Sequence, residues 1–180
     1  MTSKEVLSYA VGPDGTVYAQ NPAFVLKFRE GANDKKMTLR LANGRLANVK
    51  RRDHELNDLG IEPGSLDAAI TALTLHDLYN NSPDNALQAL VSIKAVLKPG
   101  GILGVIDHNG NAGADNAKLH RMQVADAMSL AEKAGFTVEK TSDLLANADD
   151  DRSQGVFTPG IRGKTDRFVL KLVKDSEAGS

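Results

Sequence analysis

Apolar and polar positions fall into alternating blocks between residues 65 and 109, and the blocks predict a strand, a loop, a helix, a turn and a second strand. The first strand covers residues 68–74, an apolar run without polar alternation, which predicts burial on both faces. A helix follows from Pro83 and stops at the turn Lys98-Pro99-Gly100-Gly101, before a second strand at residues 102–106. Two parallel strands joined by a helix form a right-handed crossover, so this block predicts an open α/β sheet.

The rest of the chain continues the alternation of helices and strands. The same signals predict helices at residues 2–10, 33–41 and 118–134 and strands at residues 15–20, 49–52, 138–140 and 167–173, the last two antiparallel. Residues 143–164 are polar and predict a long loop over the site, with Asp149-Asp150-Asp151 as a solvated run. Residues 175–180 are expected to be disordered. We therefore expect one domain over residues 1–174, with a doubly wound, mostly parallel α/β sheet and an antiparallel C-terminal strand.

Composition narrows the classes of partner. The 180 residues are 41% hydrophobic, which is enough for the core of one domain. Acidic and basic residues are interspersed at a net charge of −1, which argues against nucleic acid or an anionic membrane as partner. Cysteine is absent, which excludes disulfides and thiolate metal sites. No apolar stretch is long enough to cross a membrane and no signal peptide is visible, so we expect a cytoplasmic protein unless an earlier gene start adds a signal.

Polar side chains gather after both strands of the 65–109 block. His76 and Asp77 follow the first strand, and Asp107 and His108 follow the second. Because ligands of open α/β sheets bind beyond the carboxyl ends of the strands, these side chains are expected to line a ligand site. A histidine there can act as a general base, or it can cap the following segment by hydrogen bonds.

Five segments carry a resemblance to a known family. Residues 65–69 and 97–101 resemble the fourth and fifth motif regions of class I S-adenosylmethionine-dependent methyltransferases, and residues 11–19 are similar to the turn and second strand of that fold. Residues 134–138 resemble its helix-to-strand corner, and residues 161–170 resemble a bacterial subgroup of predicted methyltransferases. The resemblance covers nearly the whole chain. It implies a Rossmann-like fold, S-adenosylmethionine as cofactor and methyl transfer to a small-molecule acceptor.

The resemblance also implies roles for individual residues. Asn21 stands where the family binds the cofactor ribose, and Asp53 stands where an acidic side chain accepts from the adenine amino group. His54 would border the adenine ring, and Thr74 completes the expected cofactor-binding set. An Asn before proline also makes a turn, and an Asp often ends a strand, so a structural role stays open for both. The residues expected to be catalytic, on the acceptor side, are His76, Asp107 and His108. Methyl transfer mainly requires donor and acceptor to be aligned.

The family's first strand and glycine-rich loop have no counterpart in this sequence. Thr2 and Glu5 are spaced as a capping box, so the chain is expected to start at the helix that follows this loop. Without the first strand, two inner strand edges would be unpaired, and they would either close on each other or take up a partner. The alternative to an enzyme is therefore a non-catalytic methyltransferase-like remnant or interaction module that forms a homodimer through its opened sheet.

A metal site is a further alternative. The nitrogen and oxygen ligands that a divalent ion prefers are available from His76, Asp77, Asp107, His108 and His120. No tight spacing such as His-Glu-x-x-His is present, so the expected site contains no metal ligand. His120 and Arg121, at the start of the helix predicted at residues 118–134, are expected to fold over the same place and to complete a polar acceptor pocket.

Overall fold

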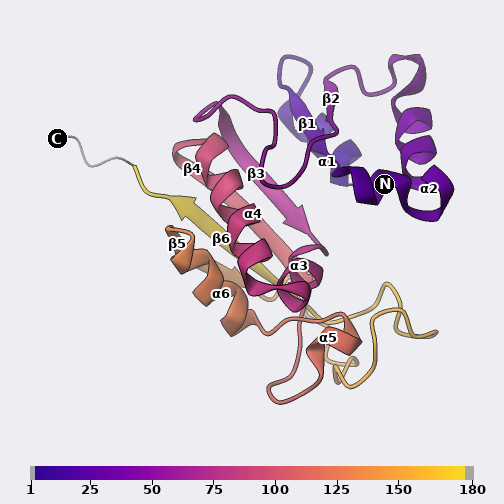
Figure 1. Cartoon of the computed structure of the whole chain (residues 1–180), viewed down its shortest axis with the longest axis vertical. Coiled ribbons are helices and arrows are strands. Elements are labelled where there is room, and N and C mark those ends of the chain that lie inside the picture. The colour runs from indigo at the N-terminus through magenta and orange to yellow at the C-terminus, as the bar shows by residue number, and fades with distance from the viewer. Residues whose placement is uncertain (1–2, 177–180) are drawn as a thin grey trace. The chain divides into compact units, whose positions relative to one another are not determined.

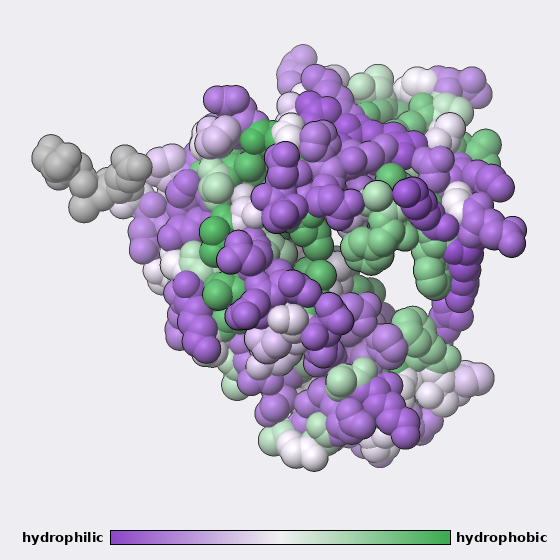
Figure 2. Space-filling view, in the orientation of Figure 1, coloured by the Kyte–Doolittle hydropathy of each residue, from purple (hydrophilic) through white to green (hydrophobic). Residues whose placement is uncertain are grey.

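The computed structural model describes residues 3–176, and the chain divides into two compact units, Met1–Gly60 and Ile61–Ser180 (Figure 1). The expected capping residue Thr2 and residues 177–180 of the expected disordered tail lie outside the described residues. Between residues 3 and 176, no helix is both long and apolar enough to cross a membrane. On the face shown in Figure 2, hydrophilic residues predominate and apolar residues are scattered among them, in keeping with the interspersed charges of the sequence.

The first unit is built on two short parallel strands. Its elements are α1 (Ser3–Val11), β1 (Val17–Gln20), α2 (Ala23–Leu41), the 3-10 turn η1 (Ala42–Gly44) and β2 (Val49–Arg52). β1 and β2 pair in register from Val17 with Val49 to Gln20 with Arg52. Asn21 and Asp53 therefore follow the two strands at the same edge of this sheet. The predicted helix at residues 33–41 is the second half of α2, whose backbone leaves the helical conformation between Phe28 and Gly31.

The second unit is built on a four-stranded sheet. Its elements are β3 (Leu66–Ala72), α3 (Leu75–Asn81), α4 (Pro83–Val96), β4 (Leu97–His108), α5 (Asn116–Leu119), α6 (Val124–Lys133), β5 (Phe136–Ser142) and β6 (Arg167–Lys174). The strand order is β3-β4-β6-β5, with β3 parallel to β4 and with β6 antiparallel to both β4 and β5. The predicted parallel crossover and the predicted antiparallel closing strand are both confirmed.

One face of this sheet carries the core of the second unit. The side chains of β4 and β6 alternate, so that Leu103 and Val105 of β4 and Leu170 of β6 all point into the core. Leu90 of α4 and Leu130 of α6 belong to the same buried cluster, and both helices lie against this face of the sheet (Figure 1). Full burial of each such leucine stabilises the fold by about 1.5–3 kcal/mol, which makes this face the rigid base of the polar residues that follow the strands.

The strand predicted to be buried on both faces is half exposed. Ile70 in the middle of β3 is 48% exposed, because β3 pairs only with β4 and its other edge is open. β1 likewise pairs only with β2.

Two further segments differ from the prediction. The segment after β3, expected to be a loop, forms the helix α3, so His76 and Asp77 lie in a first helical turn. The helix predicted at residues 118–134 is two helices, α5 and α6. The chain turns between them because His120 takes a left-handed conformation with φ of 53° and Met122 bridges to Asn109 beyond the end of β4. The carboxylate of Asp115 caps α5 by accepting from the backbone N–H of Lys118.

Candidate functional site

Asp107, near the carboxyl end of β4, holds the start of α3 in place. Its side chain is fully buried, and Oδ2 accepts the backbone N–H of His76 at 2.9 Å. Oδ1 lies 2.6 Å from His76 Nδ1 and also accepts the backbone N–H of His108 at 2.7 Å. The N–H of His76 is one of the donors that a helix start leaves without a helical partner, so the carboxylate also acts as an N-terminal cap. Neighbouring parallel strands thus bring together the three residues expected on the acceptor side.

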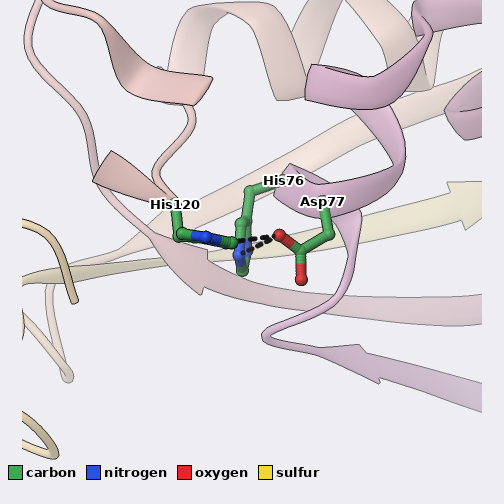
Figure 3. Close-up of side chains that lie close together, drawn as sticks. All are labelled: His76, Asp77 and His120. Carbon is green, nitrogen blue, oxygen red and sulfur yellow. Dashed lines mark hydrogen bonds and ion pairs between the residues drawn. The ribbon is translucent and has the colours of Figure 1, made fainter. Parts of the chain in front are cut away.

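Asp77 lies between His76 and His120, which comes from another part of the chain (Figure 3). His76 Nε2 lies 3.1 Å from Asp77 Oδ1, and His120 Nδ1 lies 2.8 Å from the same oxygen. His76 is buried, whereas the side chains of Asp77 and His120 are 55% and 42% exposed. His120 was expected over this place, and the structure confirms that it lies there. The left-handed turn at the end of α5, rather than a helix start, aims its ring at Asp77.

The charges of these groups follow from their contacts. Burial lowers the pKa of His76, but Asp107 and Asp77 outweigh it and raise the pKa to about 9. The close contact with His76 is the main cause that lowers the pKa of Asp77 to about 2. With no other cation present, His76 is therefore protonated at neutral pH and is a poor general base. Burial lowers the pKa of His108 to about 4, so its ring is neutral, with Nδ1 2.8 Å from the hydroxyl of Thr165.

Arg121 does not line an open pocket, as the sequence predicted, but is fully buried. Nη1 and Nη2 lie 2.9 Å and 3.0 Å from the carboxylate oxygens of Asp150, and Nη1 also donates to the carbonyl of Asn109 at 3.0 Å. Asp150 in turn accepts the backbone N–H groups of Arg152 and Asp166. The predicted loop at residues 143–164 is thereby tied to the end of β4, next to His120. The prediction of a solvated acidic run at residues 149–151 was wrong for Asp150.

Comparison with known proteins bears on the family and on the fold. Residues 17–105 match the model of a family described as a methyltransferase domain. This match covers nearly half of the chain and supports the class I S-adenosylmethionine-dependent methyltransferases, the family that the sequence resembles. No curated protein matches the sequence at a significant level.

Solved structures share the fold of this chain at low sequence identity. An S-adenosylmethionine-dependent methyltransferase from Aquifex aeolicus is 21% identical with a TM-score of 0.64, over 94% of this chain and 74% of that chain. One from Methanosarcina mazei is 12% identical with a TM-score of 0.58, over 89% and 83%. The [4+2]-cyclase SpnF is 16% identical with a TM-score of 0.59, over 96% and 80%. Since a cyclase has this fold as well, the reaction must be argued from the site.

The cofactor of the family is S-adenosylmethionine, and two residues of the first unit fit it. The Asn21 amide donates to the carbonyl of Ala19 at 3.2 Å, and within residues 3–176 its Oδ1 accepts no hydrogen bond. That oxygen is available to a ribose hydroxyl. Asp53 is paired through Oδ2 with Arg51 at 2.7 Å, which leaves Oδ1 available to an amino group. Both residues follow parallel strands, as the sequence predicted.

The other two residues of the expected cofactor-binding set already have structural partners. The ring of His54 lies against Gly60, where an added Cβ would approach within 2.4 Å, and its backbone carbonyl accepts from Gln20 at 2.7 Å. The Thr74 hydroxyl donates to the carbonyl of Ala72 at 3.2 Å. Both residues can still contact a cofactor. The packing on Gly60 involves only one face of the His54 ring, and the hydroxyl oxygen of Thr74 keeps its lone pairs for a further hydrogen bond.

Proposed function

We propose that this methyltransferase transfers the methyl group of S-adenosylmethionine to a small-molecule acceptor that meets the protein at Asp77 and His120. The observation that favours this proposal most is that buried residues hold Asp77 in place. Asp107 fixes His76 through two hydrogen bonds, and His76 fixes Asp77, so the exposed carboxylate is held in one orientation at the strand ends. Preorganised positioning is the main contribution a protein makes to such a transfer.

Burial divides the residues of this site into two groups. Asp107 is fully buried, and His76 and His108 are nearly so, which assigns all three to positioning the site rather than to touching an acceptor. Asp77 and His120 are the members that a ligand can reach. This differs from the expectation that His76, Asp107 and His108 themselves face the acceptor. The sequence offered no signal for the difference, because burial of these side chains depends on α3 and on the loop that follows residue 142.

The exposed pair suits an acceptor that carries a hydroxyl or an amine. The ionised carboxylate of Asp77 accepts a hydrogen bond from the hydroxyl or amine of the acceptor. This hydrogen bond orients the acceptor so that a lone pair of its oxygen or nitrogen points away from Asp77. When bound, S-adenosylmethionine supplies an electrophilic methyl group on its sulfonium. The acceptor oxygen or nitrogen gains the methyl group, the acceptor proton passes to water, and the demethylated cofactor leaves. The chain's part in this step is to align the acceptor.

On the cofactor side, we assign Asn21 to the ribose, Asp53 to the adenine amino group and His54 to the edge of the adenine ring, and in the second unit we assign Thr74 to cofactor binding. Asn21 is the sharpest of these assignments, because its amide oxygen carries no charge. A hydrogen bond to an ionised acceptor is roughly twice as strong as a neutral one. The natural residue is therefore a weaker ribose acceptor than a carboxylate would be.

Asn21→Asp is expected to increase the affinity for S-adenosylmethionine about 3–10-fold, since a charged acceptor adds roughly 1 kcal/mol to such a hydrogen bond. Isothermal titration calorimetry with the cofactor measures the change. Asn57→Asp is the matched control, because it adds the same charge at an exposed residue of the same unit. The assignment of Asn21 fails if both variants bind the cofactor as the natural chain does, or if both gain equally.

One observation favours a second function, that of an interaction module. Within residues 3–176, β3 pairs only with β4 and β1 only with β2, so each has an open edge, and the apolar Ile70 is exposed on β3. Open strand edges pair readily with another chain, so a homodimer through a shared sheet would satisfy them. Light scattering separates the two functions, since a stable dimer that binds no cofactor would support the module and a monomer that binds the cofactor would support the transferase.

A further inference from the structure

One buried nitrogen at the site has no hydrogen-bond partner. His76 Nε2 is enclosed by protein, and within residues 3–176 no group forms a hydrogen bond to it. Asp77 Oδ1 lies at ion-pair distance, 3.1 Å, but without the alignment of a hydrogen bond. A buried polar atom in this state costs about 1–3 kcal/mol, so its retention calls for a physical reason.

Asp107 decides which atom of the ring carries a lone pair. The carboxylate lies 2.6 Å from Nδ1, so in the neutral ring that nitrogen holds the hydrogen and donates it to Asp107. Nε2 then presents its lone pair to the oxygen of Asp77. Two lone pairs that face each other repel, and a cation between them turns the repulsion into attraction. This cation is either a proton or a metal ion.

A third donor points at the same position. His120 Nδ1 lies 2.8 Å from Asp77 Oδ1, and the ligand atoms of His76, Asp77 and His120 all lie within 4.8 Å of one another (Figure 3). A proton needs only two of these atoms, whereas a metal ion uses three. We propose that His76 Nε2, a carboxylate oxygen of Asp77 and His120 Nδ1 bind one divalent transition-metal ion, with zinc as the best match.

The spacing of the donors fits such an ion after a small adjustment. A tetrahedral zinc ion with ligands at about 2.0–2.1 Å requires its ligand atoms to be roughly 3.3 Å apart. The separations of 3.1 Å and 2.8 Å from the Asp77 oxygen therefore need to open by a few tenths of an ångström, whereas the two histidine nitrogens, which lie within 4.8 Å of each other, need to approach by at most about 1.5 Å. Asp77 and His120 can move by this amount, because both side chains are partly exposed.

The chemistry of the donors selects the class of metal. Two imidazole nitrogens and one carboxylate oxygen suit zinc and its first-row neighbours, whereas magnesium and calcium prefer oxygen alone. Three protein ligands also leave a coordination position for water or for an acceptor oxygen, as in catalytic rather than structural zinc sites.

Groups around the three ligands hold them in orientation. Asp107 supplies the carboxylate that commonly supports a metal-binding histidine through its other nitrogen. The ring of His120 meets the ring of Phe157 edge-on, with 5.0 Å between the centroids, so its direction is set by packing as well. The buried pair of Arg121 and Asp150 fixes the loop that carries Phe157.

Zinc chloride titrated into the full chain by calorimetry tests the site, without cofactor or acceptor. We expect one ion per chain with a Kd of about 1 µM or tighter. Since loss of a supporting group alone costs 10–100-fold in affinity, His120→Ala and Asp77→Asn should each weaken zinc binding by about 100-fold or more. Both residues are partly exposed, so both variants should fold. His54→Ala is the matched control and should bind zinc as the natural chain does.

The cobalt(II) form gives a second, independent result. Cobalt(II) bound by three protein ligands in a tetrahedral site should give an intense visible absorption, and His120→Ala should remove it while His54→Ala keeps it. The inference is overturned if the natural chain binds zinc no tighter than His120→Ala does, or if His54→Ala loses as much affinity. Because the measurement involves no methyl transfer, its failure would leave the proposed transferase function standing.

Discussion

Asp107→Ala is expected to lower the free energy of unfolding by about 3–5 kcal/mol, because it leaves the buried charge of His76 with only the partly exposed Asp77 as counter-ion. It also removes the acceptor of the backbone N–H groups of His76 and His108, which are then buried without partners. Urea unfolding followed by circular dichroism measures the loss. Few single residues of this chain combine complete burial with so many polar contacts.

Two further variants make this result specific. Asp107→Asn still offers an oxygen to the backbone N–H groups but loses the negative charge, so it should lose clearly less stability than Asp107→Ala. Glu139→Ala removes a half-exposed carboxylate paired with Lys171 and should cost under about 1 kcal/mol. A loss for Asp107→Ala that is no greater than the loss for Glu139→Ala would show that Asp107 does not organise the site.

Arg121→Met is expected to have an effect of similar size. It leaves the carboxylate of Asp150 buried without its cation, which costs about 3–5 kcal/mol in the free energy of unfolding. Lys98→Met provides the control. Lys98 pairs with Asp67 at 2.5 Å, and both side chains are exposed, so its replacement should cost little stability. Equal losses in the two variants would contradict a central role for the buried pair.

The pH dependence gives a further check on the same pair. Burial raises the pKa of Asp150, but its hydrogen bonds to Asp166 and to Arg121 outweigh this and lower the pKa below the usual value. A lowered pKa adds stability above the unfolded-state value of about 4, and this stability is lost as the pH falls through the folded-state pKa. The difference between the natural chain and Arg121→Met should therefore shrink as the pH falls below about 4. A difference that grows in acid would have the wrong sign.

The strand ends could be predicted from the sequence because they depend on local patterns. The apolar run before Asp107 and the Lys98-Pro99-Gly100-Gly101 turn define β4, and the turn signals around Val49–Arg52 define β2. Once two parallel strands are neighbours, their ends must share an edge. The approach of His76 to Asp107 follows from this without knowledge of any loop.

The details of the site depend on contacts between distant segments, which no local pattern encodes. The segment from Leu75 to Tyr79 breaks the strand pattern and predicts a loop, yet Asp107 caps it from another strand and stabilises it as α3. The helix predicted through His120 ends there, because Met122 pairs with the segment after β4. Arginine is usually found at the surface. The complete burial of Arg121 is possible only because the buried Asp150 pairs with it.

The exposure of β3 could not be predicted either, because it depends on distant segments. An apolar run predicts that a strand is buried, but its sequence does not tell which other strand or helix buries its side chains. Residues 68–74 contain no polar alternation, yet Ile70 is exposed because β3 is an edge strand in its sheet. Which side of a strand is paired is a property of the whole sheet.

The most direct test of methyl transfer is a titration of S-adenosylmethionine and its demethylated product into the purified chain by calorimetry, with light scattering on the same sample. We expect one molecule of either ligand to bind per chain in the micromolar range, and we expect the monomer to bind it. Absence of binding by a folded protein, above all with a stable dimer in solution, would rule out this cofactor and favour the interaction module.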